Sequence, residues 1–233
     1  MIISHKYKFI FIKTRKTAGS SVQIYLSHLC DELDIFTPID RPEQPYQPRN
    51  YKGLFNPLPE LVKNTKSPKM IFKILGRFFT LKKFQSHIKA IDIKARISPE
   101  IWNSYYKFSI ERNPWDKVLS YYYFAKQRYR RYNQNISFDD FLKTVELSFN
   151  YPKYTDINDN IIVDRVIKYE NLIDELREIF NKLDIPFNGS IGVNEKSHYR
   201  TDRRPYQEVY TEEQKLLIEK LFDKEIKMHN YKF

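Results

Sequence analysis

The feature that most constrains the fold lies near the start of the chain, where an apolar segment runs directly into a polar loop. Residues 7–13, YKFIFIK, predict a buried β-strand, and residues 20–33 predict a helix with apolar side chains every three to four positions. The loop between them, TRKTAGSS at 14–21, places cations, hydroxyls and a glycine at the start of that helix. A strand, a loop of this kind and a helix N-terminus together predict an anion-binding site.

The order of residues in this loop differs from that of a Walker A loop, in which a lysine follows the last glycine. Here Lys16 precedes Gly19, and Ser20 and Ser21 follow it. We expect Gly19 to let the backbone approach a ligand closely and Lys16 to reach over the anion as a point charge. The alternative is an ordinary turn capped by Ser20, so the loop alone does not identify the anion.

The rest of the chain alternates strand and helix patterns. Strands are predicted at 105–111 and 164–170, and helices at 114–129 and 172–183. A last helix is predicted to begin at Thr211, where TEEQ has the form of a capping box. This alternation predicts an α/β fold with a parallel sheet flanked by helices, in which ligands bind at the carboxyl ends of the strands.

The chain has the length of a single domain, 1–233, with one long surface excursion. The excursion covers about 36–68 and contains seven of the twelve prolines, so we expect little regular structure there. No apolar run reaches the roughly 20 residues of a membrane span, and the N-terminus lacks the pattern of a secretory signal. A single cysteine, Cys30, excludes an internal disulfide and Cys-rich metal sites. We therefore expect a cytoplasmic protein.

The charge of the chain indicates anionic partners. The formal net charge is +11, although solvated surface lysines could account for much of it. Residues 69–96 have a helical pattern and are strongly basic, and AKQRYRRY at 125–132 interleaves tyrosines with arginines. These segments suit stacking on acidic sugars, but a membrane-surface helix or a nucleic-acid patch would have a similar composition.

A second anion-binding motif is predicted in IERNPWDKVLS at 110–120. Arg112 ends a predicted strand, and Asn113 and Pro114 suit the start of the helix that follows. Ser120 lies on the more polar side of this helix, away from the apolar stripe of Trp115, Val118, Leu119 and Tyr122. Arg112 and Ser120 could therefore hold one phosphate jointly.

In this order, the two motifs resemble those of the sulfotransferases that use 3′-phosphoadenosine 5′-phosphosulfate (PAPS). RKTAGSS at 15–21 is similar to the family's 5′-phosphosulfate loop, and RNPWDKVLS at 112–120 is similar to its 3′-phosphate motif. VIKYENL at 166–172 and the end of the chain at 210–233 resemble other segments of the family. Arg15 departs from the pattern, because many members have proline there.

The resemblance implies a P-loop NTPase-like sulfotransferase fold, PAPS as the sulfuryl donor, no metal, and transfer to a hydroxyl, with a carbohydrate as the expected acceptor. It also implies a loop at 194–206 that closes over the donor, in which Lys196, Arg200, Arg203 and Arg204 are candidates for binding the 3′-phosphate or an anionic acceptor. The alternative is a solvated basic loop. The predicted donor-binding residues are Arg15, Lys16, Thr17, Ala18, Gly19, Ser20, Ser21, Arg112, Ser120, Lys196 and Arg200.

The resemblance further implies two catalytic residues. Lys16 would stabilise the leaving phosphate, and His87, in FQSHIKA, would be the general base, by its position ahead of the 3′-phosphate motif. Acids of the Pro-rich excursion, Glu43 or Glu60, are the alternative base.

Two other functions stay open from the sequence. One is a nucleotide-dependent phosphotransferase, although the lysine-before-glycine order argues against it. The other is a non-catalytic module that binds polyanions, whose affinity for any polyanion would fall steeply with salt. We do not expect nucleic acid to be the partner.

Overall fold

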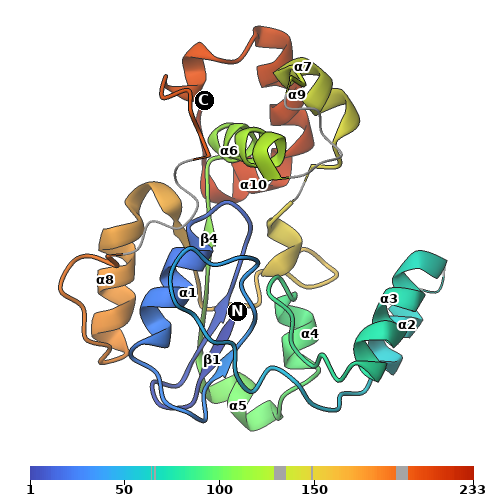
Figure 1. The fold of residues 1–233 in the computed structure, drawn as a ribbon, viewed down its shortest axis with the longest axis vertical. Coiled ribbons are helices and arrows are strands. Elements are labelled where there is room, and N and C mark those ends of the chain that lie inside the picture. The colour runs from blue at the N-terminus through green and yellow to red at the C-terminus, as the bar shows by residue number, and fades with distance from the viewer. Residues whose placement is uncertain (64, 66, 129–134, 148, 193–198) are drawn as a thin grey trace.

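The computed structural model describes residues 1–63, 65, 67–128, 135–147, 149–192 and 199–233 (Figure 1). Five strands of this part form one mixed sheet in the order β3-β1-β2-β4-β5. Strands β2, β4 and β5 are parallel, whereas β1 is antiparallel to both of its neighbours, β2 and β3. The strands are β1 (Ile2–Ser4), β2 (Phe9–Ile12), β3 (Ile35–Phe36), β4 (Tyr106–Glu111) and β5 (Arg165–Lys168).

The three parallel strands are those that the sequence predicts, and the α/β class is confirmed. The expectation of a purely parallel sheet is wrong at one edge, because β1 pairs with β2 as an antiparallel hairpin with Ile3 opposite Ile10. Only a short turn joins these strands, and it contains Lys8 with a φ of 51°. A connection this short permits only antiparallel pairing. Three residues are too few to show a strand periodicity in the sequence.

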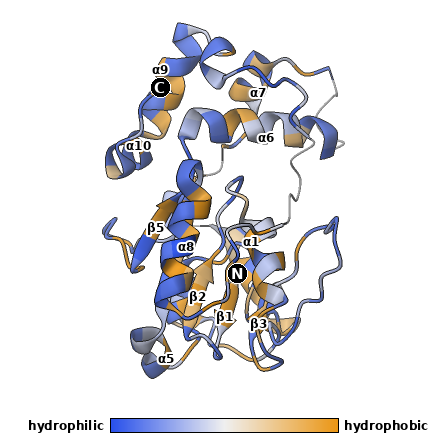
Figure 2. Cartoon of the chain, turned by 90° about the vertical axis from the view of Figure 1, so that its left-hand side faces the viewer, coloured by the Kyte–Doolittle hydropathy of each residue, from blue (hydrophilic) through white to orange (hydrophobic). Residues whose placement is uncertain are grey.

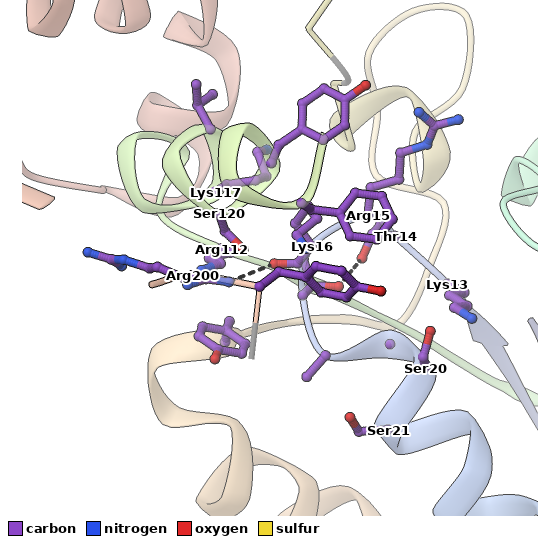
Figure 3. Close-up of a pocket in the computed structure, with 18 of the residues that line it drawn as sticks. Lys13, Thr14, Arg15, Lys16, Ser20, Ser21, Arg112, Lys117, Ser120 and Arg200 are labelled. Carbon is purple, nitrogen blue, oxygen red and sulfur yellow. Dashed lines mark hydrogen bonds between the residues drawn. The ribbon is translucent and has the colours of Figure 1, made fainter. Parts of the chain in front are cut away.

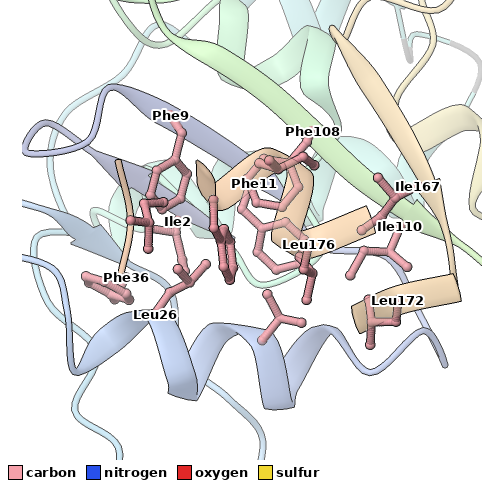
Figure 4. Packing of buried hydrophobic residues seen from close by; sticks show 14 residues of the cluster. Ile2, Phe9, Phe11, Leu26, Phe36, Phe108, Ile110, Ile167, Leu172 and Leu176 are labelled. Atoms are coloured by element: carbon pink, nitrogen blue, oxygen red, sulfur yellow. The ribbon is translucent and has the colours of Figure 1, made fainter. Parts of the chain in front are cut away.

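The two faces of the sheet have separate apolar layers because successive side chains of a strand point in opposite directions. Phe9 and Phe11 point to the face covered by helices α1 (Gly19–Ser27) and α8 (Leu172–Lys182) (Figure 4). Ile10 and Ile12 point to the other face, where they pack with side chains of α4 (Ala90–Lys94) and α5 (Pro99–Ser104). The sheet therefore lies between helical layers and ends at an edge from which the loops project.

A group of helices covers the carboxyl edge of the sheet (Figures 1 and 2). The group consists of α6 (Pro114–Arg128), α7 (Phe138–Thr144), α9 (Glu212–Leu221) and α10 (Asp223–His229). The predicted apolar stripe of α6 is buried here against Ile218 and Phe222. Two predicted helix starts are confirmed: Asn113 accepts a hydrogen bond from the Trp115 N–H, and Thr211 forms a capping box with Gln214.

Two predicted helices are shorter than expected. The first, α1, ends at Ser27. The predicted helical segment 69–96 consists of α3 (Pro68–Phe79), an irregular stretch and α4. The break has a local cause: Leu81 adopts a left-handed conformation with a φ of 53°, and the Lys82 N–H then donates to the Arg77 carbonyl at 2.9 Å, which caps the end of α3. The remaining short elements are α2 (Leu58–Lys63), within the Pro-rich excursion, and the 3₁₀ turns at Tyr151–Lys153, Tyr169–Asn171 and Tyr206–Glu208.

The core layer beneath α1 and α8 should dominate stability. We expect Leu176→Ala to lower the free energy of unfolding by about 2–5 kcal/mol, because the fully buried side chain would leave a cavity. Urea unfolding followed by circular dichroism measures this. The exposed Leu216→Ala on α9 is the matched control and should change stability by about 0.5 kcal/mol or less. Equal effects of the two variants would contradict this assignment of the core.

Candidate functional site

A pocket of about 450 Å³ opens at the carboxyl edge of β2 and β4, between α1 and α6 (Figure 3). Lys13 and Ser20 lie at one end of the view and Arg112, Ser120 and Arg200 at the other, with Lys16 between them. The pocket therefore brings together two sequence motifs that lie almost a hundred residues apart. This is the edge at which parallel α/β sheets bind ligands.

The loop between β2 and α1 has a constrained backbone. Lys16 and Ala18 adopt left-handed conformations, with φ values of 59° and 57°, which non-glycine residues rarely adopt. The fully buried Thr17 is hydrogen-bonded through its hydroxyl to the Thr14 hydroxyl at 2.8 Å, and Thr14 donates to the Ile110 carbonyl of β4. Contacts to strand β4 thus hold this strained backbone in place, and strained backbone of this kind is common at functional sites.

Gly19 is required for packing within the loop. A Cβ at this position would lie 2.9 Å from Lys13 Cγ and 3.4 Å from the Thr14 carbonyl oxygen. The absence of a side chain thus makes room for Lys13, which is buried against the pocket. The next residues, Ser20 and Ser21, are in the first turn of α1, whose N–H groups have no partner within the helix and favour an anion.

Asp116 organises the second motif by holding two arginines. Its Oδ2 accepts from Arg112 Nε at 2.8 Å and is 2.6 Å from Arg112 Nη2, while its Oδ1 accepts from Arg200 Nη1 at 2.8 Å. Ser120 lies one turn further along α6 and also lines the pocket. The predicted phosphate-binding residues Arg112, Ser120 and Arg200 are therefore brought to one wall.

Arg112 also links this wall to the first loop. Its Nη1 donates to the Lys16 carbonyl at 3.0 Å, and its guanidinium lies over the ring of Tyr169 at 4.2 Å from the centroid. The Lys16 ammonium lies 4.4 Å from the ring centroid of Phe124 on α6. Each of these cations thus lies against an aromatic face beside the pocket, and the ring attracts its positive charge.

His87 lies on the pocket wall in the irregular stretch before α4. Its Nδ1 donates to the Lys13 carbonyl at 3.1 Å, because a carbonyl can only accept, and this leaves Nε2 as the acceptor of the neutral ring. Burial, with the positive charges of Lys13 and Arg15, lowers the pKa of His87 well below 6.5. His87 is therefore neutral near pH 7 and can accept a proton.

The two acids considered as alternative bases do not line this pocket. Glu60 is buried elsewhere and forms ion pairs with Arg96 and Arg77. Glu43 is exposed in the Pro-rich excursion. Of the residues considered, His87 is the candidate base that the structure places in the pocket.

Not every predicted site residue can be placed. Lys196 lies outside the described residues, whereas Arg203, in the same predicted loop, lines the pocket. The Arg15 side chain is exposed, and its backbone N–H and carbonyl are both hydrogen-bonded to the Asn150 side chain, at 2.9 and 3.0 Å. Asn150 thus fixes the loop between β2 and α1.

Sequence reasoning missed several residues of the site. Asp116 lies inside the second motif, and Lys13 directly follows the strand, so their positions carried a signal. The positions of Lys117 and Asn150 gave no such signal in the sequence, because these residues matter through a contact with the buried Glu111 of β4, at 3.0 and 3.1 Å.

In the described ranges, no cluster of His, Cys, Asp and Glu is arranged to hold a metal. Nor does any helix described there have the length and apolarity needed to cross a membrane.

The protonation state of His87 is directly measurable. We expect nitrogen NMR of the imidazole to show a proton on Nδ1, and a pKa below 6.5 that rises in Lys13→Met, because a nearby positive charge is removed. In the urea-unfolded chain the pKa should return to about 6.5. Since the unfolded state then binds the proton more readily, this histidine should destabilise the fold as pH falls below 6.5. A proton on Nε2 or a pKa above 6.5 would contradict the assignment.

Comparison with known proteins agrees with this geometry. The profile of the Sulfotransferase family matches residues 1–232, which is almost the whole chain. A protein of Archaeoglobus fulgidus, described only as an uncharacterized protein, is 35% identical over 106 residues, covering 44% of this chain and 87% of that protein. Because the family match spans both predicted anion-binding motifs and the helices behind them, the chain belongs to the sulfotransferase family.

Proposed function

We propose that the chain transfers a sulfuryl group from PAPS to a hydroxyl group, by in-line displacement with His87 as the general base, and that the acceptor is a carbohydrate. One observation carries the proposal: Arg112 bonds the Lys16 carbonyl of the first motif while sharing Asp116 with Arg200. Two cationic subsites within one pocket suit a donor with phosphate groups at two separate positions.

The residues of the two subsites fit the two ends of the donor. Lys13, Lys16 and the first turn of α1 would hold the 5′-phosphosulfate, and Arg112, Ser120 and Arg200 would hold the 3′-phosphate. The two arginines now share the carboxylate of Asp116, so a bound phosphate would take the place of part of that contact. ATP and AMP lack the 3′-phosphate and would leave this second subsite unfilled.

The chemistry requires a base and a positive charge beside the leaving group. His87 Nε2 would take the proton of the attacking hydroxyl, since Nδ1 is held by the Lys13 carbonyl. Lys16 would stabilise the charge that develops on the leaving phosphate. The contacts that hold the loop to β4 would keep Lys16 in place without reorganisation during the reaction.

The surroundings of His87 favour an acceptor that carries negative charge. The Lys153 ammonium donates to the His87 carbonyl at 2.9 Å. Burial, with the nearby charges of Arg15, Lys89 and Lys73, lowers the pKa of Lys153 to about 8. A carboxylate or sulfate on the acceptor would relieve the repulsion among these cations. An acidic saccharide therefore suits this side of the pocket better than a neutral one.

The donor can be tested without knowing the acceptor. We expect calorimetry to give a Kd on the order of micromolar for adenosine 3′,5′-bisphosphate, and binding about tenfold or more weaker for AMP and ATP, because only the first fills both subsites. Arg112→Ala should weaken binding of the bisphosphate by about tenfold to hundredfold, since it removes a charge-assisted contact.

Two further variants make this test specific. Ser120→Ala removes one hydroxyl without disturbing the Arg112 contact to the loop, and should weaken binding by about fivefold. Arg177→Ala removes a surface arginine on α8 that pairs with Asp174, and should leave binding unchanged. Equal affinity for all three nucleotides would reject the donor assignment in favour of a phosphotransferase or a polyanion-binding module.

The base can be tested by separating turnover from binding. We expect His87→Asn to lower kcat by about 10²- to 10⁴-fold, because the amide can still donate to the Lys13 carbonyl but cannot accept a proton. Affinity for adenosine 3′,5′-bisphosphate should stay the same. The measurement is transfer of radiolabelled sulfate from PAPS to a mixture of uronic-acid oligosaccharides. His28→Asn, at the exposed end of α1, is the control, and unchanged turnover in His87→Asn would assign the base elsewhere.

A further inference from the structure

Helices α2 and α3 form a hairpin at the edge of the molecule, away from the sheet (Figure 1). The inner side of the hairpin is well fixed. Buried Glu60 of α2 pairs with Arg96 of the main body and lies 3.7 Å from Arg77 of α3. Ile74 of α3 is buried. The position of the hairpin is therefore determined without its outer side chains.

The outer side of the hairpin exposes large apolar side chains. On α3, Phe72 and Phe79 are 76% and 78% exposed and lie two turns apart, on the same face of the helix. On α2, Leu58 and Val62 are 62% and 72% exposed and lie one turn apart. Single exposed apolar residues are ordinary, but two aromatic rings on one helix face indicate a contact with something outside the chain.

The same hairpin is strongly basic. Residues 68–83 contain five cations and no acid: Lys69, Lys73, Arg77, Lys82 and Lys83. Lys69 and Lys73 are exposed and lie one turn apart, on a face of α3 next to that of the phenylalanines. A helix with phenylalanines on one face and lysines beside them has the composition of a helix that lies in the surface of an anionic membrane.

Charge decides between the possible occupants of this surface. A second copy of the chain would bring like charges together across the contact. A soluble polyanion would neutralise the lysines but would leave the phenylalanines in water. An anionic lipid surface suits both the lysines and the phenylalanines, because its headgroups attract the lysines and its acyl boundary accepts the aromatic rings.

We propose that the α2–α3 hairpin docks the protein onto an anionic lipid surface, with Phe72 and Phe79 inserted at the level of the headgroups. The proposal concerns the surface alone and holds whether or not the pocket transfers sulfate.

The experiment is co-sedimentation of the full chain with vesicles of equal parts phosphatidylglycerol and phosphatidylcholine. We expect binding to these vesicles and little to vesicles of phosphatidylcholine alone. The double variant Phe72→Ser and Phe79→Ser should lower the partition coefficient by about tenfold or more. The double variant Lys69→Gln and Lys73→Gln should lower it by about fivefold or more, and high salt should do the same.

A matched control replaces exposed apolar residues elsewhere: Leu33→Ser with Leu216→Ser should bind vesicles as the parent does. Thermal unfolding of each variant checks that it is folded, and Leu58→Ser with Val62→Ser is a second test of the same face. Equal binding to both vesicle types, or no effect of the phenylalanine variants, would overturn the proposal. Concentration-dependent dimerisation that these variants abolish in sedimentation velocity, without lipid binding, would assign the surface to a second copy.

Discussion

The site depends on one buried carboxylate, that of Glu111 at the carboxyl end of strand β4. Its Oε1 accepts from the Arg112 N–H at 2.9 Å, from Lys117 Nζ at 3.0 Å and from Asn150 Nδ2 at 3.1 Å, and its Oε2 accepts from the Tyr154 hydroxyl at 2.9 Å. A buried charge is costly unless its hydrogen-bonding capacity is filled, so these four groups must meet at this point. The first turn of α6 and the segment around Asn150 are thereby fixed relative to the sheet.

Asn150 also connects Glu111 to the loop between β2 and α1. Asn150 bonds both the N–H and the carbonyl of Arg15, and Thr14 bonds the Ile110 carbonyl, so the loop is tied to β4 and to the segment beside it. The left-handed conformations of Lys16 and Ala18 are sustained by these contacts. On the other side, Arg112 reaches the Lys16 carbonyl. Contacts within the protein thus position the cationic side chains that line the pocket, which lowers the cost of ordering them.

Much of the fold was predictable because the sequence patterns that specify it lie within short stretches of the chain. The apolar patterns of β2, β4 and β5, the helix starts at Pro114 and Thr211, and the stripe of α6 all follow from short-range periodicity and capping. The errors arose where local signals are weak or absent. β1 is too short to show a pattern, and the end of α3 depends on a left-handed leucine, Leu81, that composition does not reveal.

The sequence by itself determined the two motifs that predict anion binding, the strands that carry them and the family to which they point, because each depends on a few consecutive residues. Only the tertiary structure decided that Asp116 joins Arg112 to Arg200, that Lys117 and Asn150 support the site from within, and that His87 rather than Glu60 faces the pocket. These outcomes depend on the burial of polar groups that are far apart in sequence. A polar group that is buried without a partner costs free energy, so the whole fold sets which of these groups pair. No short stretch of residues encodes that pairing.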